Sequence, residues 1–168
     1  MSKVKIAIRV DASITMGSGH VMRCLTLADQ LVKRGCDCVF ITRRQPGDLN
    51  LMISEKGYDV HVLRKQARET EQAFEGPQSV HTAWLDCSWQ VDAKQTRDVL
   101  LEVKPDLIIV DHYALSKDWE TAVNPDSLKL MVIDDLADRE HRCSMLLDQN
   151  FCRSIEDYAN LVPDSCKC

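Results

Sequence analysis

Residues 4–35 read VKIAIRVDASITMGSGHVMRCLTLADQLVKRG, and this stretch decides the fold. Its first part alternates apolar with charged or small side chains, which predicts a β-strand with one strongly buried face. The buried positions are Val4, Ile6, Ile8 and Val10. A loop over residues 11–18 follows, and apolar residues then recur at helical spacing. These residues are Val21, Cys24, Leu25, Ala28, Leu31 and Val32. Gly35 is expected to end this helix, because glycine readily adopts the left-handed conformation found at helix C-termini.

The same alternation of strand and helix continues along the chain. Further strands are expected over residues 38–42, 58–63, 107–110, 128–133 and 145–147. Helices are expected over residues 49–56, 93–103, 119–123 and 154–161, and residues 65–80 form an expected polar surface loop with a helical turn. Strands that alternate with helices form parallel sheets with right-handed crossovers and helices on both faces. The predicted fold class is therefore α/β, with a doubly wound, Rossmann-like parallel sheet.

Composition narrows the possible partners. The 168 residues are 45% hydrophobic and 28% charged, which is ordinary for one globular domain with its own core. The net charge of −5 disfavours nucleic acid, because binding a phosphate backbone needs a concentrated basic face and the basic residues here are scattered. The densest basic cluster, Arg43-Arg44, falls in an expected loop. No segment approaches the roughly 20 apolar residues of a membrane span, and residues 1–10 read as a strand without the apolar core of a signal peptide. We therefore expect a cytoplasmic protein with no membrane partner.

The chain contains eight cysteines, but their number does not indicate a disulfide framework. Disulfides are rare in the cytoplasm, and a domain of this size does not need them. The cysteines also lack a C-x-x-C pair of the kind that holds structural zinc. We expect reduced thiols, no metal and no cofactor.

Polar side chains cluster after three of the predicted strands. Asp11 follows the first strand, and Gly17-Ser18-Gly19-His20 comes shortly after it. The fourth strand runs into Asp111, His112 and Tyr113, and the fifth runs into Asp134 and Asp135. The carboxyl ends of parallel strands share one edge of the sheet, where ligands bind in open α/β folds. We therefore expect the three clusters to line one cleft.

The turn that ends at His20 suits ligand binding and proton transfer. Glycines at positions 17 and 19 permit positive φ and let a ligand approach the backbone, and Ser18 can cap the helix. His20 falls in the first helical turn, where the helix dipole disfavours imidazolium, and a neutral imidazole can act as a general base. Arg23 lies one turn later on the same face, placed to hold an anionic or polar substrate group.

Structural roles remain open for the same residues. A Gly-x-Gly turn after a strand is common, and this one lacks the third glycine of a dinucleotide fingerprint, so His20 can equally have a capping or packing role. For His112, a positioning or packing role is favoured over a catalytic role. Asp134-Asp135 fits either a ligand site or an ordinary turn.

Four sequence blocks carry a family resemblance. The first comprises RVDAS (9–13) and GSGHVMRCL (17–25), and the others are IIVDHY (108–113), VIDDLADR (132–139) and LLDQN (146–150). They resemble the UDP-diacetamido-trideoxy-altrose hydrolases of pseudaminic acid biosynthesis and the related spore-coat-type polysaccharide biosynthesis proteins. The resemblance extends over essentially the whole chain. It departs at Asp148, where the family pattern leads us to expect asparagine.

The resemblance implies a two-domain, glycosyltransferase-B-like fold. Residues 1–153 would be its N-terminal, sugar-binding half, and residues 154–168 a terminal helix and tail. A C-terminal, UDP-binding domain would follow in cis beyond Cys168. The implied reaction is metal-independent hydrolysis of a UDP-sugar at the anomeric carbon with inversion, and His20 matches the family's catalytic histidine. The residues expected to bind substrate are Asp11, Gly17, Ser18, Gly19, Arg23, Asp111, His112, Tyr113, Asp134 and Asp135.

Three other functions fit part of the sequence. A glycosyltransferase half-domain would use His20 to activate an acceptor hydroxyl instead of water. A non-catalytic module would bind a sugar nucleotide with the same residues. A signalling receiver domain is disfavoured, because it needs an acidic pair after the first strand, where Asp11 stands alone.

Overall fold

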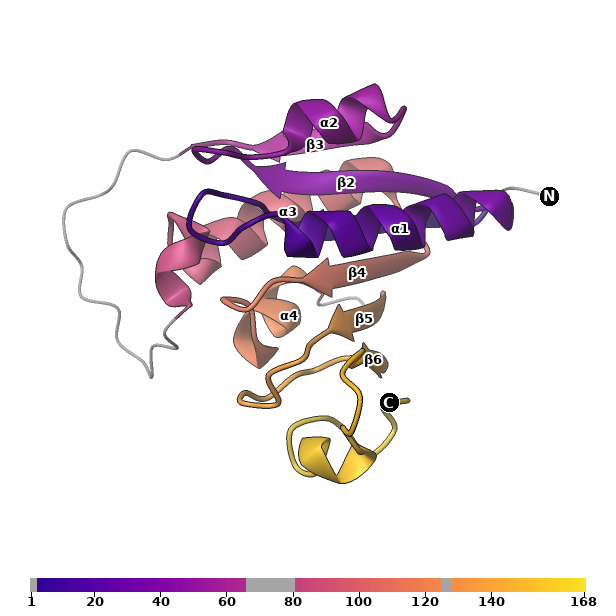
Figure 1. The fold of residues 1–168 in the computed structure, drawn as a ribbon, viewed down its shortest axis with the longest axis vertical. Helices are drawn as coiled ribbons and strands as arrows, with labels where there is room; N and C mark the ends of the chain where they lie inside the picture. The colour runs from indigo at the N-terminus through magenta and orange to yellow at the C-terminus, as the bar shows by residue number, and fades with distance from the viewer. Residues whose placement is uncertain (1–2, 66–80, 125–127) are drawn as a thin grey trace.

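A computed structural model describes residues 3–65, 81–124 and 128–168. Its centre is a six-stranded parallel sheet with the order β3-β2-β1-β4-β5-β6 (Figure 1). The strands are β1 (Lys5–Val10), β2 (Asp37–Arg43), β3 (Asp59–Leu63), β4 (Leu107–Asp111), β5 (Lys129–Ile133) and β6 (Met145–Leu147). This arrangement confirms the predicted doubly wound α/β class, and its strand order reverses between β1 and β4. Residues 66–80 of the predicted surface loop lie outside the described residues.

Helices cover both faces of the sheet. They are α1 (Gly19–Lys33), α2 (Asn50–Glu55), α3 (Trp89–Val103) and α4 (Lys117–Val123). On one face, Leu25 of α1 and Ile53 of α2 share an apolar cluster with Ile8. On the other face, Leu100 of α3 and Trp119 of α4 share a second cluster with Ile108 and other strand residues. Within the described ranges, no helix combines the length and apolarity needed to cross a membrane.

The central strand β1 is buried on both faces, not on one as its alternation predicts. Ala7 and Arg9 point away from the face that carries Ile8, and both are fully buried. Central strands of parallel sheets are commonly covered on both sides by helices. Arg9 tolerates burial because its guanidinium pairs with Asp11 at 2.5 Å and with Asp92 at 2.7 Å.

Asp92, in the first turn of α3, joins four elements through one buried carboxylate. It pairs with Arg9 of β1, and Arg43 Nη2 of β2 lies 2.8 Å from it. Trp119 Nε1 of α4 donates a hydrogen bond to it at 2.9 Å. Arg43 was expected in a loop, but it is the buried last residue of β2 because Asp92 compensates its charge.

Two of the predicted helices differ most from the observed ones. α3 begins at Trp89, four residues before the predicted start, because Ser88 caps it by accepting a hydrogen bond from the Val91 amide. The predicted helix over residues 154–161 is only a 3₁₀ helix, Ile155–Tyr158. The chain after residue 153 packs against the sheet: Tyr158 is buried, and the amide of Leu146 donates to the carbonyl of Lys167.

Replacing the Asp92 carboxylate should destabilise the fold strongly. Asp92→Asn leaves Arg9 and Arg43 buried with one anion fewer, and breaking such a buried pair typically costs about 3–5 kcal/mol in the free energy of unfolding. Asp98→Asn, on the exposed side of the same helix, should change this free energy by less than about 0.5 kcal/mol. Urea denaturation of both variants measures the difference, and equal small effects would refute the central role of Asp92.

Candidate active site

The candidate site centres on a hydrogen-bonded pair, His20 and Asp111. His20 is the second residue of α1, which follows β1, and Asp111 ends β4, the strand beside β1. The pair therefore lies where the strand order reverses, the position at which doubly wound folds bind ligands. His20 Nδ1 lies 2.7 Å from Asp111 Oδ1.

The protonation of Asp111 decides the tautomer of His20. Burial alone would raise the pKa of Asp111, but hydrogen bonds from Arg23 and His20 hold it below its ordinary value. An ionised carboxylate only accepts hydrogen bonds, so we assign Nδ1 of His20 as the donor to Asp111 at 2.7 Å. Arg23 Nη2 also lies 3.1 Å from this nitrogen, but it makes its shorter hydrogen bond, 2.6 Å, to Asp111 Oδ1. In the neutral ring Nε2 then carries the lone pair, and Nε2 is the nitrogen that can accept a proton.

Arg23 contacts protein carboxylates in the structure, although we predicted that it holds a substrate group. Its Nε and Nη2 atoms donate to the two oxygens of Asp111 at 2.5 and 2.6 Å. Its Nη1 atom donates to Asp135 at 2.8 Å. This two-pronged geometry fixes the plane of the Asp111 carboxylate, and with it the direction in which His20 is held.

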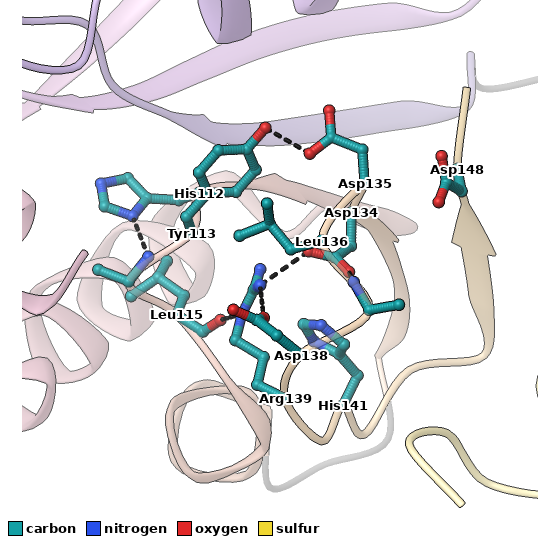
Figure 2. Close-up of polar contacts among 12 residues, drawn as sticks. His112, Tyr113, Leu115, Asp134, Asp135, Leu136, Asp138, Arg139, His141 and Asp148 are labelled. Carbon is teal, nitrogen blue, oxygen red and sulfur yellow. Dashed lines mark hydrogen bonds and ion pairs between the residues drawn. The ribbon is translucent and has the colours of Figure 1, made fainter. Parts of the chain in front are cut away.

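Tyr113 and Asp135 complete the group around His20. The Tyr113 hydroxyl donates to the Asp135 carboxylate, and Figure 2 shows the two side chains pointing toward each other. Burial, followed by the hydrogen bond to Asp135 and then by the charge of Asp135, raises the pKa of Tyr113 to about 12, so the phenol keeps its proton near neutral pH. The Tyr113 ring meets the His20 ring edge-on, with 4.5 Å between centroids.

Two aromatic residues of the site were not predicted. The ring centroids of His81 and Trp84 lie 5.2 and 5.8 Å from that of Tyr113. Trp84 is also 6.4 Å from the ring of His20. Both residues belong to the segment before α3 and follow no predicted strand, so the strand-end rule cannot find them. A tryptophan within a polar stretch was the one available signal.

Asp11 and His112 lie on the opposite side of β4 from the His20–Asp111 pair. Asp111 and His112 are consecutive residues and point to opposite faces of the sheet. His112 Nδ1 accepts a hydrogen bond from the amide of Ala114, so its proton is on Nε2, 3.3 Å from Asp11. Burial lowers the pKa of His112. Asp11 is itself buried and pairs with Arg9. The lone pair of His112 on Nδ1 is therefore taken by the Ala114 amide, and Nε2 is buried beside Asp11 without a hydrogen bond of good geometry, which leaves His112 no lone pair for substrate.

Asp134 shapes the loop that presents Asp135. Asp134 Oδ2 accepts the amide of Ala137 at 2.9 Å, and Arg139 Nη1 lies 2.8 Å from Asp134 Oδ1 (Figure 2). The Tyr158 hydroxyl lies 2.8 Å from the carboxylate of Asp148 and 2.9 Å from the carbonyl of Asp134. Asp148, which stands where we expected asparagine, thus binds the C-terminal segment.

The glycine turn before His20 is exposed. Gly17 has a φ of +78°, and its amide donates to the carbonyl of Ser13 at 2.7 Å, which closes the turn. Ser18 occupies the N-cap position, but within the described chain its hydroxyl makes no capping hydrogen bond, contrary to our prediction. Gly17, Ser18 and Gly19 therefore present backbone and hydroxyl groups to solvent beside His20.

The structure thus brings five of the predicted residues into one connected group. They are His20, Arg23, Asp111, Tyr113 and Asp135. Asp11 and His112 form a second, buried group, and Asp134 contacts neither group through its side chain in the part of the chain that is described. Among the described residues, no three His, Cys, Asp or Glu side chains are arranged to hold a metal ion.

Comparison with solved structures supports the predicted Rossmann-like α/β fold. The structure is similar to that of MurG from Acinetobacter baumannii, with a TM-score of 0.58 and 13% sequence identity. The similarity covers 91% of this chain and 44% of the MurG chain. No family model matches the chain.

The sequence adds more specific relatives. The chain is 28% identical over 165 residues to UDP-2,4-diacetamido-2,4,6-trideoxy-beta-L-altropyranose hydrolase of Campylobacter jejuni, which confirms the predicted resemblance. It is also 26% identical over 132 residues to the uncharacterised protein MJ1062 of Methanocaldococcus jannaschii. These matches cover 98% and 79% of this chain. The chain spans 48% of the hydrolase and 22% of MJ1062, so it corresponds to half or less of each relative.

The burial of neutral His112 should make stability depend on pH. Its folded-state pKa lies below its unfolded value of about 6.5, so the unfolded chain binds more protons as the pH falls below neutrality. The free energy of unfolding should therefore decrease from pH 7 toward pH 5, above the range in which the buried aspartates are protonated. His112→Gln should be less stable at pH 7 and should show a smaller decrease. Urea unfolding at pH 7, 6 and 5 tests this, and parallel curves for both proteins would contradict it.

Proposed function

We propose that the chain is the sugar-side half of a nucleotide-sugar hydrolase, in which His20 activates water for attack on a UDP-linked diacetamido-trideoxy sugar. The observation that carries the proposal is the 2.7 Å hydrogen bond between His20 Nδ1 and Asp111, where the strand order reverses. The similarity to a UDP-sugar hydrolase over 98% of the chain supports the same class of reaction.

The proposed step follows from the tautomer of His20. Nε2 takes a proton from water while the water oxygen bonds to the anomeric carbon, on the face opposite the diphosphate. The bond between that carbon and the diphosphate oxygen breaks, and its electron pair leaves with UDP. The imidazolium formed on His20 lies against the Asp111 carboxylate, which stabilises it. Inverted free sugar and UDP are the products, and the proton returns from Nε2 to solvent.

The other members of the group have positioning roles in this proposal. Arg23 fixes Asp111 and Asp135, and Asp135 holds the hydroxyl of Tyr113, whose ring lies against His20. A ligand group that hydrogen-bonded to Asp135 or Tyr113 would replace one of these protein hydrogen bonds. The exposed turn at Gly17, Ser18 and Gly19 would border the bound sugar.

The residues on the far side of β4 support the site from beneath. We assign Asp11 and His112 to holding the ends of β1 and β4 in register, and Asp134 to holding the loop that carries Asp135. The UDP would be bound chiefly by a C-terminal domain in cis, corresponding to the part of the hydrolase that this chain does not match.

Glycosyl transfer is the second candidate, and the GT-B fold shared with MurG favours it. His20 would then deprotonate an acceptor hydroxyl. Incubating the full-length protein with the UDP-sugar in ¹⁸O-labelled water separates the two reactions. Hydrolysis places one ¹⁸O atom on the anomeric carbon of the free sugar, whereas turnover that requires an added acceptor and releases no labelled sugar would establish transfer.

Removing the base should reduce turnover far more than substrate affinity. In the full-length protein, His20→Ala should lower kcat by about 10²–10⁴ or more with little change in KM, because the lost interaction forms in the transition state. Asp111→Asn should also lower kcat, because an amide can donate to Nδ1 and favour the wrong tautomer. His61→Ala, on the edge strand β3, is the matched control and should keep wild-type turnover. A His20→Ala variant with wild-type kcat and a raised KM would make His20 a binding residue.

A further inference from the structure

Three aromatic side chains stand together beside His20, and we refer to His81, Trp84 and Tyr113 as the aromatic wall. The rings of His81 and Trp84 are 4.5 Å apart and meet at 67°, and those of Trp84 and Tyr113 are 5.8 Å apart and tilted by 31°. His20 contacts the wall through Tyr113 and Trp84. The wall therefore adjoins the imidazole ring that we propose as the base.

The position of Trp84 is fixed by its backbone. It lies in a 3₁₀ helix, Thr82–Leu85, and the next residue in that helix, Leu85, is buried in the core. The carbonyl of Trp84 accepts a hydrogen bond from Gln45 Nε2 at 2.8 Å, which ties the segment to the loop after β2. The ring is thus held at the carboxyl edge of the sheet by contacts that do not involve the ring itself.

The three tryptophans of the chain do not share one role. Trp119, a residue of α4, is fully buried in the core, and Trp89 of α3 packs against the same core. Trp84 is half-buried and belongs to neither apolar cluster of the described residues. Core packing therefore explains Trp89 and Trp119 and leaves Trp84 unexplained.

We propose that the aromatic wall, and Trp84 above all, selects the sugar by stacking on its C–H and methyl groups. This inference rests on the proposed function. A diacetamido-trideoxy sugar presents acetyl methyl groups and deoxy positions where common hexoses carry hydroxyls. Aromatic rings gain from covering such apolar groups, whereas a hydroxyl pressed against a ring loses its water without gaining a partner. The wall should therefore favour acylated deoxy sugars over hydroxylated ones.

The test is the ratio of kcat/KM for two substrates of the full-length protein. One is a UDP-2,4-diacetamido-2,4,6-trideoxyhexose, and the other is UDP-N-acetylglucosamine, which keeps the hydroxyls at positions 4 and 6. Trp84→Ala should lower this ratio by about tenfold or more, in line with the discrimination that one or two apolar groups provide. Trp84→Phe should retain most of the preference, because it keeps a ring face. The ratio does not depend on how much of each preparation is active, so partial loss of folding does not obscure it.

The control is Trp89→Ala, which removes the same residue type five positions later in the chain and should leave the ratio unchanged. If Trp84→Ala keeps the wild-type ratio, the aromatic wall does not select the sugar, and the hydrolase proposal is untouched. If the wild-type protein hydrolyses neither substrate, the proposed function itself fails. A ratio that falls equally in the Trp84→Ala and Trp89→Ala variants would also overturn the role of the wall, since it would reflect general loosening.

Discussion

A carboxylate removed from water must be compensated by cations or N–H donors, and this constraint organises the carboxyl edge of the sheet. Asp11, Asp92 and Asp111 are three of the almost completely buried aspartates there or beneath it. Arg9 and Arg43 compensate the first two, and Arg23 with His20 compensates the third. The positions of these arginines, one on each of β1, β2 and α1, follow from this requirement.

The buried carboxylates and the cations that neutralise them form two groups, one on each face of the sheet, and the two groups have different roles. On the side of α3, the ion pairs of Asp92 link four elements and have no opening toward a ligand in the described chain. On the side of α1, Asp111 is hydrogen-bonded to His20, which lies in the first turn of a helix that begins at an exposed glycine turn. The first arrangement holds the ends of the strands in place. The second leaves an imidazole nitrogen near the surface, which is the requirement for proton transfer.

The main elements of the fold and several residues of the candidate site could be predicted from the sequence. The alternation around Ile8 and the helical spacing around Leu25 are local signals, and both elements form where expected. The strand-end rule brought His20, Asp111 and Asp135 to one edge because parallel strands share their direction. The roles of Arg43 and Arg23 could not be predicted, because the residues that neutralise them, Asp92 and Asp111, lie 49 and 88 positions away. Trp84 was missed because it follows no strand.

The proposed mechanism depends most on the proton that Asp111 fixes on His20. Similarity to a UDP-sugar hydrolase supports the class of chemistry that we propose, whereas the tautomer determines whether His20 can take part in it. Long-range ¹H–¹⁵N correlation spectra of the imidazole report the tautomer directly, and a His20→Gln spectrum assigns the signal. At a pH where the ring is neutral, the account predicts a protonated Nδ1 and a bare Nε2. A bare Nδ1 with the proton on Nε2 would contradict it.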